Sequence, residues 1–441
     1  MSLPSTLSRV AKFSLRPLRL VSAVCRRPKT AGLGIVLLVL AGGCGVHFWA
    51  ESEERAARLA IKEERYPDAR RHVEHCLMVW RRSASTHLLA ARVARLQFDF
   101  PRAEVHLHKS TELAGGASAG TQLEWLLLRV QAGDVDTVAP GLLRLVVADD
   151  PESPAILEAL SGAYVRQMQL RPALGCLNLW LKREPDSVPA LDRRGWTWDR
   201  LQSQDAARAD WERALELAPW RWETRLRLAD LLLDENNPTE ALPHVEYLQR
   251  THSERPEVVA ALGRCRLLQG DLAEAATAFD RVVAAAPDNP TGLLWRGKVA
   301  VEEGQDAEAE TWLRRALEKD PYLLEAHYAL YQTLGHQTGR RAEAAAEKTR
   351  YDELKADVER LTKLMNGDRS RSPEPADVCA EIGGLLLRLG RTKLAREWLE
   401  RALRLDEKCK PAHEALATFC EQEGDTEGAT RHRRLAEGQE P

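Results

Sequence analysis

Residues 256–289 read PEVVAALGRCRLLQGDLAEAATAFDRVVAAAPDN, and residues 290–323 read PTGLLWRGKVAVEEGQDAEAETWLRRALEKDPYL. Both stretches follow one pattern, in which a small residue comes early and an alanine follows it. A large apolar residue, a further small or apolar residue and a proline come after that alanine at fixed distances. In the first stretch these positions are Gly263, Ala275, Phe279, Val282 and Pro287. The pattern therefore repeats every 34 residues.

The same register runs along most of the chain. Ala309 and Leu313 stand in the next unit where Ala275 and Phe279 stand in the first. Spacings of three and four residues place such side chains on one face of a helix. A proline then ends that helix, because its ring blocks continuation. By this register, units begin near residues 50, 84, 120, 154, 188, 222, 256, 290, 324, 376 and 410.

This pattern resembles the tetratricopeptide repeat family, whose unit is a helical hairpin of about 34 residues. The resemblance implies an all-α fold, a right-handed superhelical solenoid of about eleven helix-turn-helix repeats. It also implies a concave groove, lined by the first helix of each unit, in which family members hold extended peptides. Repeats occupy the chain from about residue 50 to its end, which leaves no stretch for a separate catalytic domain.

A transmembrane helix is predicted ahead of the repeats, over residues 31–50. This stretch has no charged side chain, and a helix of about 20 residues is about 30 Å long, enough to cross a hydrocarbon core. Residues 1–50 hold seven Lys and Arg and no acid, all seven before the stretch, and Glu51 follows it. This bias predicts an uncleaved signal anchor with a cytoplasmic N-terminus and a periplasmic body.

Two other interpretations of the N-terminal region stay open. The residues before Cys44 resemble the lipobox of bacterial lipoproteins, which would make Cys44 a lipid-attachment site instead of part of a spanning helix. Residues 1–29 are rich in arginine and free of acids, as mitochondrial presequences are. The predicted parts of the chain are a basic segment (1–30), the anchor (31–50), a repeat array ending in an extended helix (51–366), a linker (367–375) and C-terminal repeats with a capping helix (376–441).

The extended helix, residues 341–365, interrupts the rhythm of the repeats. Apolar residues recur along it at spacings of three and four, in the manner of a coiled-coil stripe. These residues are Tyr351, Leu354, Val358, Leu361 and Met365. One interpretation is a long second helix that packs its stripe on its own array. The other is a helix that binds a partner or a second copy of the chain.

Composition and motifs exclude several functions. The chain has a formal net charge of -3, and the acidic excess beyond residue 50 argues against nucleic-acid binding, which needs a basic face. No phosphate-binding loop, dinucleotide-binding turn, nucleophile elbow or zinc-protease motif occurs. We therefore predict no catalytic residue, no cofactor and no metal ligand.

Histidines and cysteines are the candidates for metal or redox chemistry in this sequence. His72 and Cys76 lie four residues apart, close to His75, and zinc uses such spacings. Cys76, however, occupies a packing position of its repeat, so no metal site is assigned. The eight cysteines form no Cys-x-x-Cys pair, and buried free thiols are favoured over a disulfide. A metal-dependent or redox enzyme remains the alternative from another class.

A protein-binding site is predicted on the groove face of the first helices. Trp196 falls on that face, and charged residues of both signs occur at matching places in neighbouring repeats. An aromatic anchor among such charges suits an extended peptide; the alternative is that Trp196 packs between adjacent repeats. The predicted residues are Arg166, Trp196, Asp199, Arg200, Asp230, Asp234, Arg264 and Lys298.

The sequence thus predicts a noncatalytic, membrane-anchored scaffold that binds a protein or peptide segment in the groove of the solenoid. It predicts no nucleic-acid partner and leaves homo-oligomerisation open. The alternative within binding proteins is an assembly factor for the envelope or for polysaccharide export. That factor would act by oligomerisation through residues 341–365.

Overall fold

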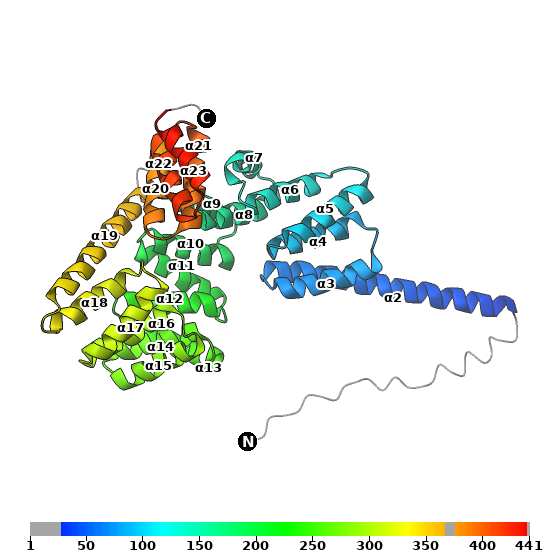
Figure 1. Cartoon of the computed structure of the whole chain (residues 1–441). Helices are drawn as coiled ribbons and strands as arrows, with labels where there is room; N and C mark the ends of the chain where they lie inside the picture. The colour runs from blue at the N-terminus through cyan, green and yellow to red at the C-terminus, as the bar shows by residue number, and fades with distance from the viewer. Residues whose placement is uncertain (1–27, 367–374, 439–441) are drawn as a thin grey trace, which may run out of the picture. The chain divides into compact units, whose positions relative to one another are not determined.

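A computed structural model describes residues 28–366 and 375–438, with side chains from residue 45 onward. These residues form 22 helices and no strand (Figure 1). Twenty of the helices pair with a sequence neighbour into ten hairpins, and the two helices on either side of residues 132–134 do not pair with each other. The helices are α2 (Pro28–Lys62), α3 (Tyr66–Val79), α4 (Ala84–Leu96), α5 (Phe100–Ala114), α6 (Ala119–Gln131), α7 (Val135–Val147), α8 (Ser153–Arg166), α9 (Leu170–Arg183), α10 (Val188–Arg200), α11 (Gln204–Leu217), α12 (Trp222–Asp234), α13 (Pro238–His252), α14 (Pro256–Gln269), α15 (Leu272–Ala285), α16 (Pro290–Glu302), α17 (Asp306–Lys319), α18 (Leu324–His336), α19 (Arg341–Met365), α20 (Ala376–Arg388), α21 (Thr392–Leu405), α22 (Lys410–Gln422) and α23 (Thr426–Ala436). The prediction of an all-helical solenoid is confirmed.

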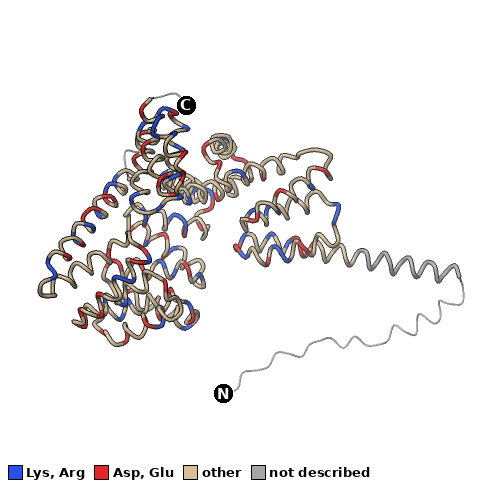
Figure 2. Tube along the Cα trace, in the orientation of Figure 1, with Lys and Arg blue, Asp and Glu red and all other residues tan. Residues whose placement is uncertain are grey.

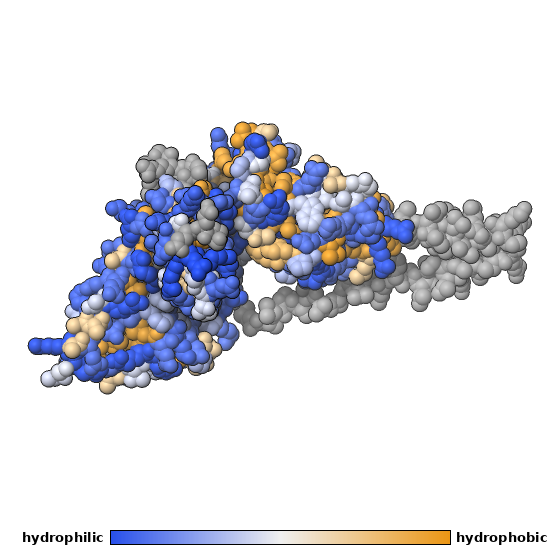
Figure 3. Space-filling model, turned by 45° about the horizontal axis from the view of Figure 1, so that its top comes forward, coloured by the Kyte–Doolittle hydropathy of each residue, from blue (hydrophilic) through white to orange (hydrophobic). Residues whose placement is uncertain are grey.

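The chain divides into two compact units, Met1–Ala132 and Gly133–Pro441. The first unit contains α2 to α6 and the second contains α7 to α23. In both units, basic and acidic residues are interspersed along the helices (Figure 2). On the surface seen in Figure 3, hydrophilic residues predominate, with apolar residues in patches between them. The apolar positions of the repeat pattern are largely buried between helices.

Close approach between the two helices of a hairpin explains the small residue of the repeat pattern. A Cβ atom added at Gly263 would lie 2.8 Å from the ring of Phe279, and one added at Gly297 would lie 2.9 Å from Leu313. Phe279 and Leu313 have no exposed surface. Only glycine leaves room for these side chains, so the 34-residue pattern reports the packing inside each hairpin directly.

The turn inside each hairpin contains a residue in the left-handed region. Gly270 and Gly304 have φ of 84° and 72°, which glycine adopts without a steric penalty. Met168, Gln202 and Asn236 occupy the corresponding positions with φ of 56°, 59° and 58°. A left-handed backbone costs a side chain with a Cβ about 1–2 kcal/mol. The turn geometry is therefore kept along the array whether or not the sequence supplies glycine.

A buried ion pair joins α4 to α6 in the first unit. Glu124 of α6 is fully buried and accepts hydrogen bonds from Arg92 and Arg95 at 2.5 and 2.7 Å. Burial raises the pKa of Glu124, but the two guanidinium groups lower it more, so the pKa lies below its ordinary value. Glu124 is therefore held as a carboxylate. Removing one partner of such a pair leaves an uncompensated buried charge, which is strongly destabilising.

The predicted transmembrane stretch, residues 31–50, lies within α2, which begins at Pro28 and runs unbroken to Lys62. In the part of the chain that the structure describes, no helix is long and apolar enough to cross a bilayer. This finding overturns the prediction of a single-pass membrane protein with a cytoplasmic N-terminus and a periplasmic body. The described part of α2 is rich in charge from residue 51 onward. Cys44 and residues 1–27, on which the lipoprotein and presequence interpretations rest, lie outside the residues whose side chains are described.

The apolar stripe of α19 packs largely on its own chain. Leu354 is buried, and the ring of Tyr351 lies 5.0 Å from that of Tyr328 in α18. Leu361 packs against the apolar cluster of the C-terminal repeats, while Val358 is partly exposed. The helix leads from α18 towards α20 (Figure 1). Most of the predicted linker, residues 367–374, lies outside the described residues.

Candidate functional site

The predicted binding residues lie on first helices of successive hairpins in the second unit. These helices contact one another directly, from α8 to α10 and from α12 through α14 to α16. Trp196, Asp230, Arg264 and Lys298 follow one another at 34-residue steps, so they occupy the same position in four repeats. Side chains at one repeat position on adjacent first helices form a row, and this row carries the candidate site.

Arg264 is the centre of the row. Its Nη1 donates to Oδ1 of Asp230 at 2.9 Å, and its Nη2 donates to Asp234. Its guanidinium carbon also lies 4.9 Å from the ring centroid of Trp295, and Nζ of Lys298 lies 4.3 Å from that same centroid. The structure therefore joins α12, α14 and α16 through one arginine and one tryptophan.

Trp295 was missed by sequence analysis. It stands on α16 two positions before Gly297, the small residue of the pattern in this repeat, and nothing in that pattern singles it out. Its role depends on cations from two different repeats, which only the folded chain brings together. We call the combined set the charged face. Its members are Trp196, Asp199, Arg200, Asp230, Asp234, Arg264, Trp295 and Lys298.

Trp196 is half-buried. Its side chain packs against the apolar core formed by α11 to α14. The guanidinium of Arg200 lies 5.3 Å from its ring centroid, and Arg200 is also 3.8 Å from Asp199. Trp196 thus contributes to packing between repeats and still presents surface beside charged side chains.

Two carboxylates of the charged face, Asp230 and Asp199, have raised pKa values. Burial raises the pKa of Asp230 to about 6; Arg264 opposes the rise, whereas Asp234 and Asp199 add to it. Burial also raises the pKa of Asp199, which Arg200 opposes. On the basic side, burial lowers the pKa of Lys298. The net charge of this face therefore changes with pH near 6.

Arg166 lies apart from this row, at the end of α8. Burial lowers its pKa, the nearby Arg193 lowers it further, and Glu397 of α21 opposes the shift. Arg166 therefore has the C-terminal repeats as neighbours. Seven of the eight predicted residues form the charged face, and Arg166 belongs to a different contact.

That contact joins the C-terminal repeats to the beginning of the second unit, and we call it the closing contact. Trp398 of α21 is almost fully buried, and its Nε1 donates to the backbone oxygen of Gln167 at 3.0 Å. Arg171 of α9 donates from Nε to the backbone oxygen of Met365 at 3.1 Å. Arg404 of α21 forms an ion pair of 3.1 Å with Asp136 of α7. Helices from the start of the second unit, α7 to α9, therefore contact α21 and the end of α19, far along the same array.

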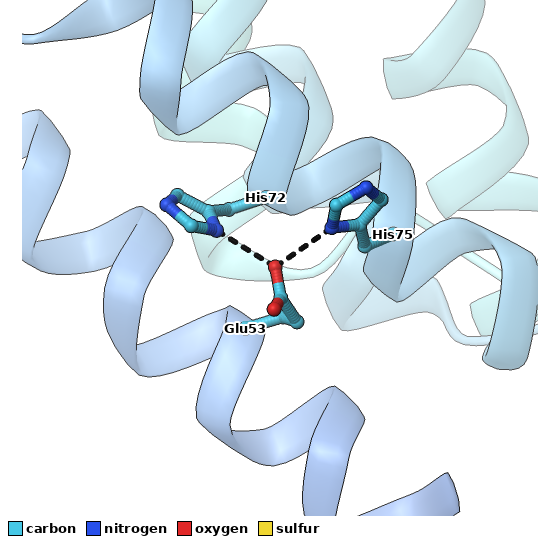
Figure 4. A group of neighbouring side chains, drawn as sticks. All are labelled: Glu53, His72 and His75. Atoms are coloured by element: carbon cyan, nitrogen blue, oxygen red, sulfur yellow. Dashed lines mark hydrogen bonds and ion pairs between the residues drawn. The ribbon is translucent and has the colours of Figure 1, made fainter. Parts of the chain in front are cut away.

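A separate cluster lies in the first unit, between α2 and α3. Oε2 of Glu53 is 2.7 Å from Nδ1 of His72 and 2.9 Å from Nδ1 of His75 (Figure 4). These hydrogen bonds lower the pKa of Glu53. Cys76, which sequence analysis considered beside the two histidines, is buried, and its Sγ donates to the backbone oxygen of Ala50. Glu53, not Cys76, is the third member of the cluster.

The tetratricopeptide repeat model matches residues 226–290 and 269–323, and a second tetratricopeptide repeat model matches residues 376–409. These matches confirm the tetratricopeptide repeats that the sequence predicted over residues 226–323 and 376–409. Repeats of this kind form protein-interaction scaffolds with extended concave surfaces, and the matches support that class for this chain. No curated protein matches the sequence.

Several solved structures are similar to the chain at low identity. A tetratricopeptide repeat protein from Parabacteroides merdae is 14% identical, with a TM-score of 0.42, covering 67% of this chain and 96% of that one. YrrB, described as having an unusual peptide-binding site, is 18% identical, with a TM-score of 0.35, covering 42% and 94%. A human IFIT1 dimer with a capped RNA is 15% identical, with a TM-score of 0.42, covering 80% and 89%. These likenesses carry no argument about function.

Proposed function

We propose that the protein is a noncatalytic scaffold that binds an extended protein or peptide segment along the charged face. The observation that supports this most directly is the row formed by Trp196, Asp230, Arg264 and Lys298 at one repeat position. A row with a period of one repeat suits an extended ligand that lies across successive first helices. Peptide recognition by such surfaces combines side-chain anchors with contacts to the ligand backbone.

The chemistry of the charged face suits a ligand that carries both signs of charge. Asp230 and Asp234 accept from Arg264 in the free protein, so a basic side chain of the ligand would share or replace that arginine. Lys298 and the released Arg264 would then meet an acidic side chain or a backbone oxygen. The Asp230 and Asp234 side chains are 43% and 63% exposed, so a basic group of the ligand can reach both carboxylates.

Trp196 and Trp295 supply the apolar part of the site. Each ring is covered by a cation, Arg200 over the first and both Arg264 and Lys298 over the second. Cation–π contacts at exposed sites are worth about 0.5–1 kcal/mol. An aromatic or aliphatic side chain of the ligand gains more by burial, so it would displace the flexible cations and pack on the rings.

Oligomerisation through residues 341–365 has less support. Most of the stripe on α19 already packs on α18 and on the C-terminal repeats. A partner helix would need that same stripe to be free. The charged face is accordingly the better candidate for an interaction surface.

The test is chemical crosslinking of the full-length chain to its ligands in a lysate of its own cells, comparing three forms. These are the unmodified protein, Trp196→Ala, and Trp220→Ala as the matched control. Trp220 is 71% exposed and lies in a turn away from the charged face. Loss of an anchor residue weakens binding by about 2 kcal/mol or more, roughly 30-fold. We expect Trp196→Ala to lose a ligand that the other two forms retain.

A fourth form separates lost binding from lost packing, because part of Trp196 packs in the core. Asp234 is 63% exposed, so Asp234→Lys reverses a charge on the face without disturbing the interior. Capture of the same ligand by all four forms would overturn the proposal. If Trp196→Ala loses the ligand while Asp234→Lys keeps it unchanged, the site is not the charged face.

A further inference from the structure

The cluster in the first hairpin has the composition of a metal site. Glu53 comes from α2, and His72 and His75 come from α3, three residues apart and therefore on one helix face. The Nδ1 atoms of His72 and His75 both point to one carboxylate oxygen of Glu53 (Figure 4). All three ligand atoms lie within 4.8 Å of one another. In the described part of the chain, this is the one group of three such side chains that converges in this way.

Comparison with the same repeat positions in other hairpins shows which contacts of this cluster recur and which occur in the first hairpin alone. The position of Glu53 and His72 recurs in other hairpins as a polar pair that links the two helices. His87 and His106 form it in the second hairpin, with 3.0 Å between Nδ1 atoms, and His413 and His432 form it in the last, also with 3.0 Å. A polar contact between the two helices at these positions is therefore shared by several repeats.

The third ligand is what sets the first hairpin apart. The position of His75 is occupied by Lys109 in the second hairpin and by Leu435 in the last. Neither residue is a zinc ligand, and neither pair includes a carboxylate. The first hairpin alone among these three combines a carboxylate, a pair contact and a further imidazole at the same point.

We propose that Glu53, His72 and His75 bind a Zn²⁺ ion that joins α2 to α3. Two imidazoles and a carboxylate are a ligand set that zinc uses, and three protein ligands leave a fourth position for water. The carboxylate offsets one of the two charges of the ion. Their side chains are 17%, 30% and 35% exposed, so an ion can reach them from solvent.

The ligand spacing needs only a small adjustment. Zinc lies about 2.0–2.2 Å from nitrogen and oxygen ligands, so tetrahedral ligands stand roughly 3.3 Å apart. The present oxygen–nitrogen distances are 2.7 and 2.9 Å. Rotation about the side-chain bonds of Glu53 opens the required space without movement of either helix.

Zinc binding would tie folding of the first hairpin to the metal. An ion that binds the folded state and not the unfolded chain stabilises the fold by mass action. The effect would be local to α2 and α3, because repeats contact mainly their neighbours. The ring of Trp49 lies 5.5 Å from His75 and would sense the ion through its fluorescence.

The experiment is calorimetric titration of ZnCl₂ into untagged full-length protein that has been stripped of metal with a chelator. The variant is His75→Lys, which installs the residue that the second hairpin carries at the same position. The control is His106→Gln, which breaks the His87–His106 pair and leaves the cluster intact. We expect one Zn²⁺ per chain for the unmodified protein and for the control, and binding at least about tenfold weaker for the variant.

Two further measurements keep the outcome clear. Circular dichroism of the metal-free variant checks folding, and His75 is exposed enough for the substitution to be tolerated. Titration with Co²⁺ reports the coordination directly, because bound Co²⁺ absorbs visible light. Both His75→Lys and Glu53→Gln should weaken the binding of Co²⁺. The proposal is overturned if the unmodified protein takes up no Zn²⁺, or if the variant and the control bind it equally.

Discussion

Two kinds of interface hold the second unit together, and they differ in how far apart their residues lie in the sequence. Consecutive hairpins meet through contacts between successive repeats, such as that of Arg264 of α14 with Asp230 of α12. The closing contact instead joins Trp398 to Gln167 and Arg404 to Asp136. The first kind joins residues about one repeat apart, whereas the second joins residues more than 200 positions apart in the sequence.

The difference shows what a repeating sequence determines. Local interfaces follow from the repeat itself, because every unit buries the same positions against its neighbour. The closing contact depends on the summed curvature of many repeats and on the length of α19. It also carries a loop-closure cost that local contacts do not, although that cost grows slowly with loop length. A unit with both kinds of contact should unfold more cooperatively than an open array.

The largest effect is expected from breaking a local interface at its most buried residue. Phe279→Ala empties a fully buried ring position against Gly263, and such truncations cost about 3–5 kcal/mol. Urea unfolding followed by circular dichroism should show this loss. Leu268→Ala, at a position that is 38% exposed, is the control and should change the stability by less than about 1 kcal/mol. Equal effects of the two substitutions would contradict the packing described here.

Breaking the closing contact should cause a smaller loss of stability, confined to the helices that this contact joins. Trp398→Phe keeps most of the ring but removes the hydrogen bond to Gln167, a loss of about 0.5–1.5 kcal/mol. Amide hydrogen exchange should rise in α7 to α9 and in α21, and stay unchanged in α14 and α15. Phe279→Ala should show the opposite distribution. Faster exchange in α14 and α15 on Trp398→Phe would mean that the two kinds of interface are not separable.

The smallest effect is a pH dependence of a local interface at Asp230. Its pKa in the folded chain is about 6, above its ordinary value of 3.8. Between these values the folded state holds the proton more tightly, so stability should fall as the pH rises from about 4 to about 6 and then level off. Asp230→Asn should lose this slope, as measured by urea unfolding at several pH values. A slope of opposite sign in the unmodified protein would show that Arg264 outweighs burial.

The starting residues of most first helices could be predicted from the sequence to within one residue. The first helices from α4 to α22 begin within one residue of the starting points given by the repeat register. Gly263 is small because the ring of Phe279 packs directly against it, as the repeat pattern indicated. The exception is α2, which begins at Pro28 because it continues the first repeat towards the N-terminus.

Contacts of individual side chains were predicted less well. The charged face combines seven predicted residues, but Trp295 was missed because its partners, Arg264 and Lys298, come from two successive repeats. Glu53 was missed although it stands 34 residues before His87, since that position is not part of the apolar pattern. The neighbour Glu397 of Arg166 could not be predicted, because it lies far away in sequence.

The closing contact also determines how the second unit bears force. Its first helix, α7, is tied to α21 near the other end of the unit by the ion pair of Asp136 and Arg404. Tension applied between these ends would load the closing contact first, and the repeats between them would remain relaxed until it broke. The second unit would therefore resist extension while the closing contact is intact. It would extend more easily once the hydrogen bond of Trp398 to Gln167 is broken.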